Sequence, residues 1–222
     1  MTLLGIDTST PASAACVLRA DGASFEVEPS PERLAAGPAH ARELMPAVAE
    51  VMERAGLGFG DLEAIAVGVG PGTFTGLRIG IATARALASA SGLLLRPVSS
   101  LAALAEGIDA ELRLPLIDAR RGELFAALHP ADGEPIWPPF VAAPEAVAER
   151  VREAGLVVRA AGDGSIRFRG VLEAAGIGVD ADESRSHLVR ALHVCRLAQT
   201  LPGEPPETVL PDYLRAPDAK IP

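Results

Sequence analysis

The same order of elements occurs twice along the 222-residue chain, and this repeat limits the fold more than any other feature. In each half, three short strand-like stretches precede a helical stretch, a buried strand that ends in Gly-x-Gly, and a further helix. The two glycine turns are Gly70-Pro71-Gly72 and Gly162-Asp163-Gly164. Strands that alternate with helices are typical of α/β proteins. The repeat therefore predicts a duplicated α/β unit, with a boundary near residues 107–113.

Hydrophobic periodicity and turn residues place the individual elements. Pro46 is compatible with a helix only in its first turn, which leaves the start of the first helix open. In the first half we expect strands at residues 3–6, 14–19, 24–28, 64–69 and 93–98, and helices at 41–55, 75–91 and 99–107. In the second half we expect strands at 114–118, 123–129, 135–141 and 157–161, and helices at 144–154, 166–175 and 187–200.

Composition excludes several classes of protein. The 29 acidic and 20 basic residues give a net charge of −9, which argues against a free-standing nucleic-acid binder. Cys16 and Cys195 have no metal or redox spacing and fit a reducing compartment. The N-terminus lacks the basic start of a signal peptide, and the apolar stretch at 77–95 carries Arg78 and Arg85. We therefore expect a soluble cytoplasmic globule.

Asp7, Thr8 and Ser9 follow the first strand and are the first candidates for a cofactor site. With Thr10, they present a carboxylate and three hydroxyls at the end of a strand, and such a turn meets phosphate and Mg²⁺ in an actin-like ATPase fold. The alternative is an Asx-turn in which Asp7 bonds its own backbone, and the residue types alone favour this turn.

Gly70, Gly72 and Thr73 form the second candidate cofactor site, because a loop before a helix offers free N–H groups to an anion. The loop is neither a Walker A motif nor Gly-x-Gly-x-x-Gly. A tight strand-to-helix connection capped by Thr73 or Thr75 explains the same residues equally well.

The next helix has a face of very small side chains, because Gly76, Gly80, Ala84 and Ala88 recur every four residues. Such a face allows another helix to approach closely. That helix could belong to a partner chain, or the face could pack on this chain's own sheet or on its 41–55 helix. The 41–55 helix has its own apolar residues at helical spacing, including Leu44, Val48, Val51 and Met52.

Other catalytic arrangements receive little support. The four histidines have no His-x-x-x-His or His-Glu-x-x-His spacing, so we expect no metal site. No Gly-x-Ser-x-Gly elbow occurs. Asp7 and Asp118 end corresponding strands of the two halves and could face each other, but the sequence does not fix their distance.

Four motifs in order resemble the bacterial TsaB (YeaZ) family. They are Leu4 to Ser9, the run from Gly70 to Gly80, Asp118-Ala119-Arg120-Arg121-Gly122-Glu123, and Pro211 to Arg215. The resemblance implies an actin-like (ASKHA) fold with two related βββαβα subdomains, the second one reduced. We place these subdomains at residues 1–107 and 108–222.

The resemblance also implies a role in forming N6-threonylcarbamoyladenosine at position 37 of tRNAs that read ANN codons. In that family the TsaB chain is a non-catalytic partner, so the resemblance implies that this chain is a scaffold subunit without a cofactor of its own. A TsaD-like transferase and a TsaE-like ATPase supply the metal and ATP, and tRNA is met only through the complex. The interface residues would be Leu44, Val48, Val51, Met52, Gly76, Gly80, Ala84 and Ala88, facing the transferase or a second copy. The absence of a His-x-x-x-His pair agrees with the partner role.

Two other functions compete with this one. An ATP-dependent phosphotransferase of the same fold would use Asp7 and the 70–76 loop on phosphates and Mg²⁺. A peptidase has less support, because no nucleophile–base pair is evident in the sequence.

Overall fold

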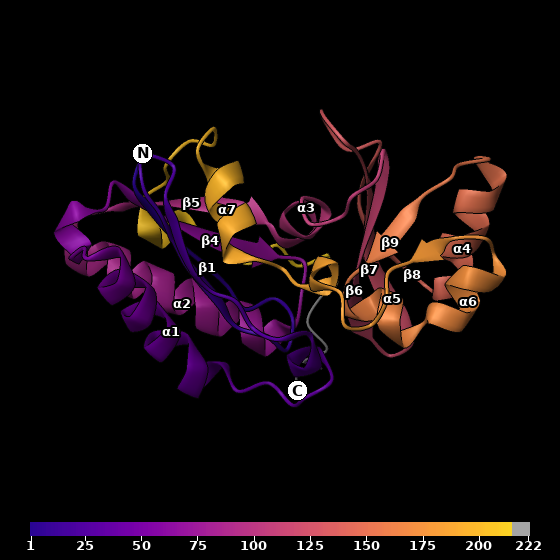
Figure 1. Ribbon diagram of the computed structural model, residues 1–222, viewed down its shortest axis with the longest axis horizontal. Helices are drawn as coiled ribbons and strands as arrows, with labels where there is room; N and C mark the ends of the chain where they lie inside the picture. The colour runs from indigo at the N-terminus through magenta and orange to yellow at the C-terminus, as the bar shows by residue number, and fades with distance from the viewer. Residues whose placement is uncertain (215–222) are drawn as a thin grey trace, which may run out of the picture.

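The first half of the chain forms a five-stranded mixed sheet in the order β3-β2-β1-β4-β5 (Figure 1). The computed structural model describes residues 1–214. Strands β1 and β2 are antiparallel, as are β2 and β3, whereas β1, β4 and β5 are parallel. The strands are β1 (Leu3–Asp7), β2 (Ala14–Leu18), β3 (Ser24–Val27), β4 (Ala64–Gly70) and β5 (Leu94–Ser99).

The second half repeats this topology, with the order β8-β7-β6-β9-β10. Here too the first three strands pair antiparallel and the last two join the first in parallel. The strands are β6 (Leu112–Arg120), β7 (Glu123–Pro130), β8 (Trp137–Ala142), β9 (Arg159–Ala161) and β10 (Gly178–Val179). The predicted duplicated α/β unit is confirmed, and the shorter β9 and β10 make the second sheet smaller.

Helices cover both faces of each sheet. α1 (His40–Ala55) and α2 (Phe74–Ser91) share an apolar core with one face of the first sheet. α4 (Pro144–Glu153), α5 (Asp163–Arg167) and α6 (Arg169–Ala174) contact the second sheet or one another. α3 (Ser100–Ala105) lies between the two sheets, in a core that includes residues of both. Within residues 1–214, no helix has the length and apolar run needed to cross a bilayer.

The last helix, α7 (Ala191–Ala198), returns to the first half and packs on β1 and β2. Ion pairs with β3 and the residue after it hold the segment before α7: Arg190 contacts Glu26 at 2.5 Å and Glu28 at 3.6 Å, and Arg185 also contacts Glu28. Glu26 Oε1 also accepts a hydrogen bond from the Leu192 amide at 3.0 Å. All strands of the first sheet precede the proposed boundary between residues 107 and 108, and all strands of the second sheet follow it. α7 follows the boundary in sequence but packs on the first sheet.

Three local expectations need correction. Pro46 lies in the second turn of α1 rather than the first, where the carbonyl that loses its donor belongs to exposed Arg42 and can meet water. The helix expected at 166–175 is divided into α5 and α6, and a two-residue strand, β10, follows that the periodicity did not reveal. The helix expected at 187–200 is α7 preceded by the short turn η3 (Arg185–His187), because the extended residues 188–190 span the two halves.

Candidate functional site

Asp7 forms the Asx-turn that the residue types favoured. Its Oδ1 accepts hydrogen bonds from the Ser9 amide at 2.8 Å and the Ser9 hydroxyl at 2.6 Å. Its Oδ2 accepts the Ser100 hydroxyl at 2.9 Å. Burial raises the pKa of Asp7, and the three hydrogen bonds act in the opposite direction. The carboxylate is thus occupied by the chain's own donors.

The loop at residues 70–76 is filled by the same turn. The Thr73 amide donates to the Ser9 carbonyl at 2.7 Å, and a Cβ on Gly72 would lie 2.5 Å from that oxygen. The Thr8 hydroxyl donates to the Gly76 carbonyl at 2.8 Å. The six candidate cofactor residues therefore meet in one place, where they form a packed junction between β1 and α2. They are Asp7, Thr8, Ser9, Gly70, Gly72 and Thr73.

Two buried polar atoms at this junction lack a partner among the described residues: His40 Nε2 and Thr73 Oγ1. His40 Nδ1 is 2.8 Å from the Ser13 hydroxyl, and burial lowers the pKa of His40. Thr73 occupies the N-cap position of α2, but its side chain makes no capping bond. The prediction that a threonine hydroxyl caps this helix is therefore wrong. Gly72 and Gly76 are explained by the close approach of residues 8–9, at the end of β1, to the start of α2.

The small-residue face of α2 packs inside this chain. A Cβ on Gly76 would lie 2.1 Å from the Thr8 carbonyl oxygen, and one on Gly80 would lie 2.2 Å from the Thr8 hydroxyl. Ala84 and Ala88 are fully buried. Leu44, Val48, Val51 and Met52 of α1 are buried in the same core. These eight residues are therefore buried within the chain's own core, and the exposed surface of α1 and α2 is their opposite face.

That opposite face carries exposed small and apolar residues. Met45 is 45% exposed and Phe74 is 41% exposed. Phe74 stacks on Tyr213 with ring centroids 5.2 Å apart, and the Arg78 guanidinium lies 3.8 Å from the centre of the Phe74 ring. The remaining exposed small residues follow helical spacing: Ala41 and Ala49 on α1, and Ala82 and Ala86 on α2.

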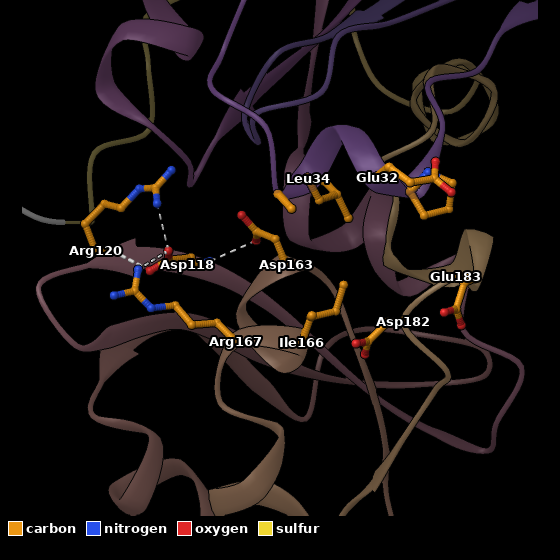
Figure 2. A pocket seen from close by; sticks show the side chains of 11 residues that line it. Glu32, Leu34, Asp118, Arg120, Asp163, Ile166, Arg167, Asp182 and Glu183 are labelled. Atoms are coloured by element: carbon orange, nitrogen blue, oxygen red, sulfur yellow. Dashed lines mark hydrogen bonds and ion pairs between the residues drawn. The ribbon is translucent and has the colours of Figure 1, made fainter.

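A cavity of about 430 Å³ opens between the two halves (Figure 2). Its first wall comes from the short turn η1 (Pro31–Leu34), and its second wall from the end of β6, from α5 and from the loop after β10. The lining residues are Pro31, Glu32, Leu34, Ala35, Asp118, Arg120, Asp163, Ile166, Arg167, Asp182 and Glu183.

Asp118 holds two arginines at one end of this cavity. Its Oδ2 is 3.1 Å from Arg120 Nη1 and 2.7 Å from Arg167 Nη1. Its Oδ1 accepts a hydrogen bond from the Arg120 amide at 2.8 Å. Asp7 Oδ1 accepts the Ser9 amide in the same way, since in both cases the donor lies two residues after the aspartate. Arg120, Arg121 and Gly122 all have positive φ and form the tight turn between β6 and β7.

Asp163 is the carboxylate that the motif analysis missed. It follows Gly162 at the start of α5, is 9% exposed, and accepts the Asp118 amide through Oδ1 at 3.0 Å. Burial, with the nearby Asp118 charge, raises the pKa of Asp163 to about 6. The sequence offered Asp7 and Asp118 as a possible carboxylate pair. In the structure the carboxylate next to Asp118 is Asp163, whereas Asp7 accepts hydrogen bonds from Ser9 and Ser100. The sequence feature that could have pointed to Asp163 is its position between the two glycines of the second glycine turn, Gly162-Asp163-Gly164.

Comparison with known proteins places this arrangement in a family. The family model of TsaD, tRNA N6-adenosine threonylcarbamoyltransferase, matches residues 31–158. An uncharacterized Pseudomonas aeruginosa protein with similarity to peptidase YEAZ has a solved structure that covers 96% of this chain and 99% of its own, with a TM-score of 0.81 and 31% identity. The chain belongs to the TsaB/YeaZ family. The full-length likeness confirms the actin-like α/β fold.

Two sequence relatives show how the family is related to the transferase. The Escherichia coli tRNA threonylcarbamoyladenosine biosynthesis protein TsaB is 34% identical over 161 residues, which cover 69% of this chain and 67% of that protein. A tRNA N6-adenosine threonylcarbamoyltransferase of Novosphingobium aromaticivorans is 36% identical over 105 residues, which cover 40% of this chain and 30% of the transferase. This TsaB/YeaZ chain therefore shares only part of its length with the transferase. Among the residues described, no three metal-ligating side chains form a group that could hold a metal ion.

Proposed function

We propose that this chain is the non-catalytic scaffold subunit of the complex that forms N6-threonylcarbamoyladenosine in tRNA. Its partners would be a TsaD-like transferase and a TsaE-like ATPase, and tRNA would be bound through the complex. The name of the E. coli relative supports the pathway. The net charge of −9 supports an indirect contact with tRNA, because phosphate binding needs basic residues.

The observation that carries the scaffold role is the outer face of α1 and α2. Ala41, Met45 and Ala49 follow one line along α1, while Ala82 and Ala86 follow one line along α2. Short side chains let another helix approach closely, and charged residues are depleted from the centres of protein interfaces. A paralogue with the same fold offers matching helices, and the transferase relative shares sequence with this chain. We assign this face to the TsaD-like partner, with a second copy of this chain as the alternative occupant.

The competing phosphotransferase would need an open phosphate site at residues 70–76. In this chain the Thr73 amide and the Asp7 carboxylate are both engaged by Ser9. This packing argues for a structural role of the junction, and we retain the scaffold as the proposed function.

The test compares an arginine at the outer face with one elsewhere. Ala86→Arg places a long cation in the proposed interface, whereas Ala146→Arg makes the same change at an exposed position of α4. We expect Ala86→Arg to weaken binding to the purified TsaD-like partner by about a hundredfold, which is about 2.8 kcal/mol. Ala146→Arg should bind normally, and both variants should melt at the wild-type temperature. Normal binding by Ala86→Arg would refute the assignment of this face.

A further inference from the structure

The cavity between the two halves has an unusual balance of charge. Five carboxylates and two guanidiniums line it, and both guanidiniums already contact Asp118. Asp182 is also paired, with Arg169. The acidic groups that face the cavity without an ion pair to any residue in 1–214 are Asp163, Glu32 and Glu183.

Asp163 differs from the other buried carboxylates of this cavity. Asp118 is balanced by two arginines, whereas the Asp163 carboxylate accepts backbone hydrogen bonds from Asp118 and Gly164 and, among residues 1–214, forms no ion pair. The charge of Arg120 acts on Asp163 only from beyond ion-pair distance. A buried ionised carboxylate without a counter-ion is costly. In Figure 2, the Asp163 side chain points from α5 into the cavity, on the same side as Leu34. The cavity therefore contains a buried acceptor that a cationic ligand would satisfy.

The space beside Asp163 is apolar. Ile166 lies next to it on α5, and Leu34 of η1 faces Ile166 (Figure 2). Pro31 and Ala35 also line the cavity. Leu34 and Ile166 belong to one apolar cluster that joins the two halves. Beyond them, Glu32 and Glu183 supply carboxylates at the far end of the cavity. Along the cavity, the buried carboxyl group of Asp163 is thus followed by an apolar section and then by a second acidic section.

We propose that this cavity binds a small aliphatic diamine. One ammonium group contacts Asp163, the alkyl chain lies between Leu34 and Ile166, and the second ammonium contacts the carboxylates of Glu32 and Glu183. The volume of about 430 Å³ lies within the usual range of small-ligand sites, roughly 300–1,000 Å³. This site is separate from the outer face of α1 and α2, so the two proposals can fail independently.

The direct test is calorimetric titration of the full chain with 1,4-diaminobutane at low ionic strength and pH 7.5. We expect saturable binding with one site per chain, at least tenfold weaker in Asp163→Asn. The amide keeps an oxygen for the Asp118 N–H, which favours a folded variant. Asp132→Asn removes one exposed acidic charge outside the cavity and should bind like the wild type. Equal binding by Asp163→Asn, or no saturable binding by the wild type, would overturn the proposal.

Two further arms identify the groups involved. Butylamine, which has one ammonium, should bind more weakly than the diamine, and Glu183→Gln should reduce diamine affinity while leaving butylamine affinity unchanged. This second variant tests the site even if Asp163→Asn does not fold.

Malonate tests whether the cavity binds an anion instead, because a dianion would contact Arg120 and Arg167. Saturable binding of malonate with none of the diamine would contradict the proposal.

Binding should also depend on pH, since Asp163 must be ionised to hold an ammonium group. Its pKa of about 6 predicts that affinity for the diamine rises between pH 5 and pH 7. In Asp163→Asn this rise should be lost, and a rise that persisted there would contradict the assignment. The other charged or titratable groups near Asp163 are Asp118 and Arg120 on β6, Arg167 on α5, Glu32 on η1, Asp182 and Glu183 after β10, and His187 behind Gly162.

Discussion

At the scale of single residues, three aspartates at strand ends show how the environment decides a role. Asp7 is satisfied by hydroxyl and amide donors, and Asp118 by two arginines. Asp163 is buried with backbone donors alone and forms no ion pair with any of residues 1–214. The sequence indicated the turn at Asp7, because an Asx-turn is a local structure. It could not reveal the state of Asp163, which depends on residues far away in the chain.

The charge of Asp163 should cost stability at neutral pH. Its pKa is raised from 3.8 to about 6, so the folded state favours the protonated form. The contribution of Asp163 to the free energy of unfolding is therefore most favourable below pH 3.8. It falls as pH rises from 3.8 through 6 and is constant at higher pH. A difference of that size corresponds to at most about 3 kcal/mol. We expect Asp163→Asn to stabilise the chain by about 1–3 kcal/mol at pH 7.5, measured by urea unfolding.

The same measurement at lower pH checks the cause. Because the wild-type carboxyl is protonated in both states below pH 3.8, the advantage of Asp163→Asn should shrink steadily as pH falls from 6 toward 4. An advantage that is equal at pH 4 and pH 7.5 would show that ionisation of Asp163 is not its source.

At the scale of secondary structure, α2 has two small-residue faces, one buried and one exposed. The inner face, with Gly80 and Ala84, accommodates the Thr8 turn and the first sheet. The outer face, with Ala82 and Ala86, is exposed. The four-residue spacing in the sequence revealed that a close contact exists. It could not distinguish contact within the chain from contact with a partner, because both need the same short side chains.

This difference predicts opposite results for adjacent alanines. Ala84→Leu inserts three carbon atoms into a closed core, which should lower the free energy of unfolding by about 1–3 kcal/mol or more. Ala86→Leu is the matched control, because it makes the same change on the exposed face and should leave that free energy within about 0.5 kcal/mol. Thermal unfolding of both variants decides the point. Wild-type stability in Ala84→Leu would mean that the inner face is not tightly packed.

Most long elements could be predicted from periodicity, including β1, β4, α1 and α2. The differences occur where the tertiary structure determines the boundary. β10 has two residues, too few to show an alternating pattern. The start of α7 is stabilised by Glu26, whose carboxylate accepts the Leu192 amide from a distant part of the chain. The cavity depends on η1 and α5 meeting across the two halves, which no local motif encodes.

At the scale of the whole molecule, the two halves are joined by a shared core. α3 packs between the sheets, and α7 crosses back to cover β1 and β2 (Figure 1). Leu3 and Cys16 of the first sheet are buried in this core together with Cys195 of α7. Residues 1–107 alone would therefore expose one apolar face of the first sheet.

We expect the fragment 1–107 to be unable to fold alone, because it lacks α7, whereas the full chain should unfold in one cooperative transition. Circular dichroism and heteronuclear NMR of the fragment would check this. A fragment with dispersed amide signals and a cooperative melt would show that the first sheet is stable without α7.

The central claim is that this chain supports a transferase through the outer face of α1 and α2. The most direct measurement is mass spectrometry of N6-threonylcarbamoyladenosine in tRNA after reaction with the TsaD-like transferase, the TsaE-like ATPase and their substrates. Modification should require this chain, should fall by at least tenfold with Ala86→Arg at partner concentrations below saturation, and should be normal with Ala146→Arg. Full modification without the chain, or with Ala86→Arg at those concentrations, would contradict the account.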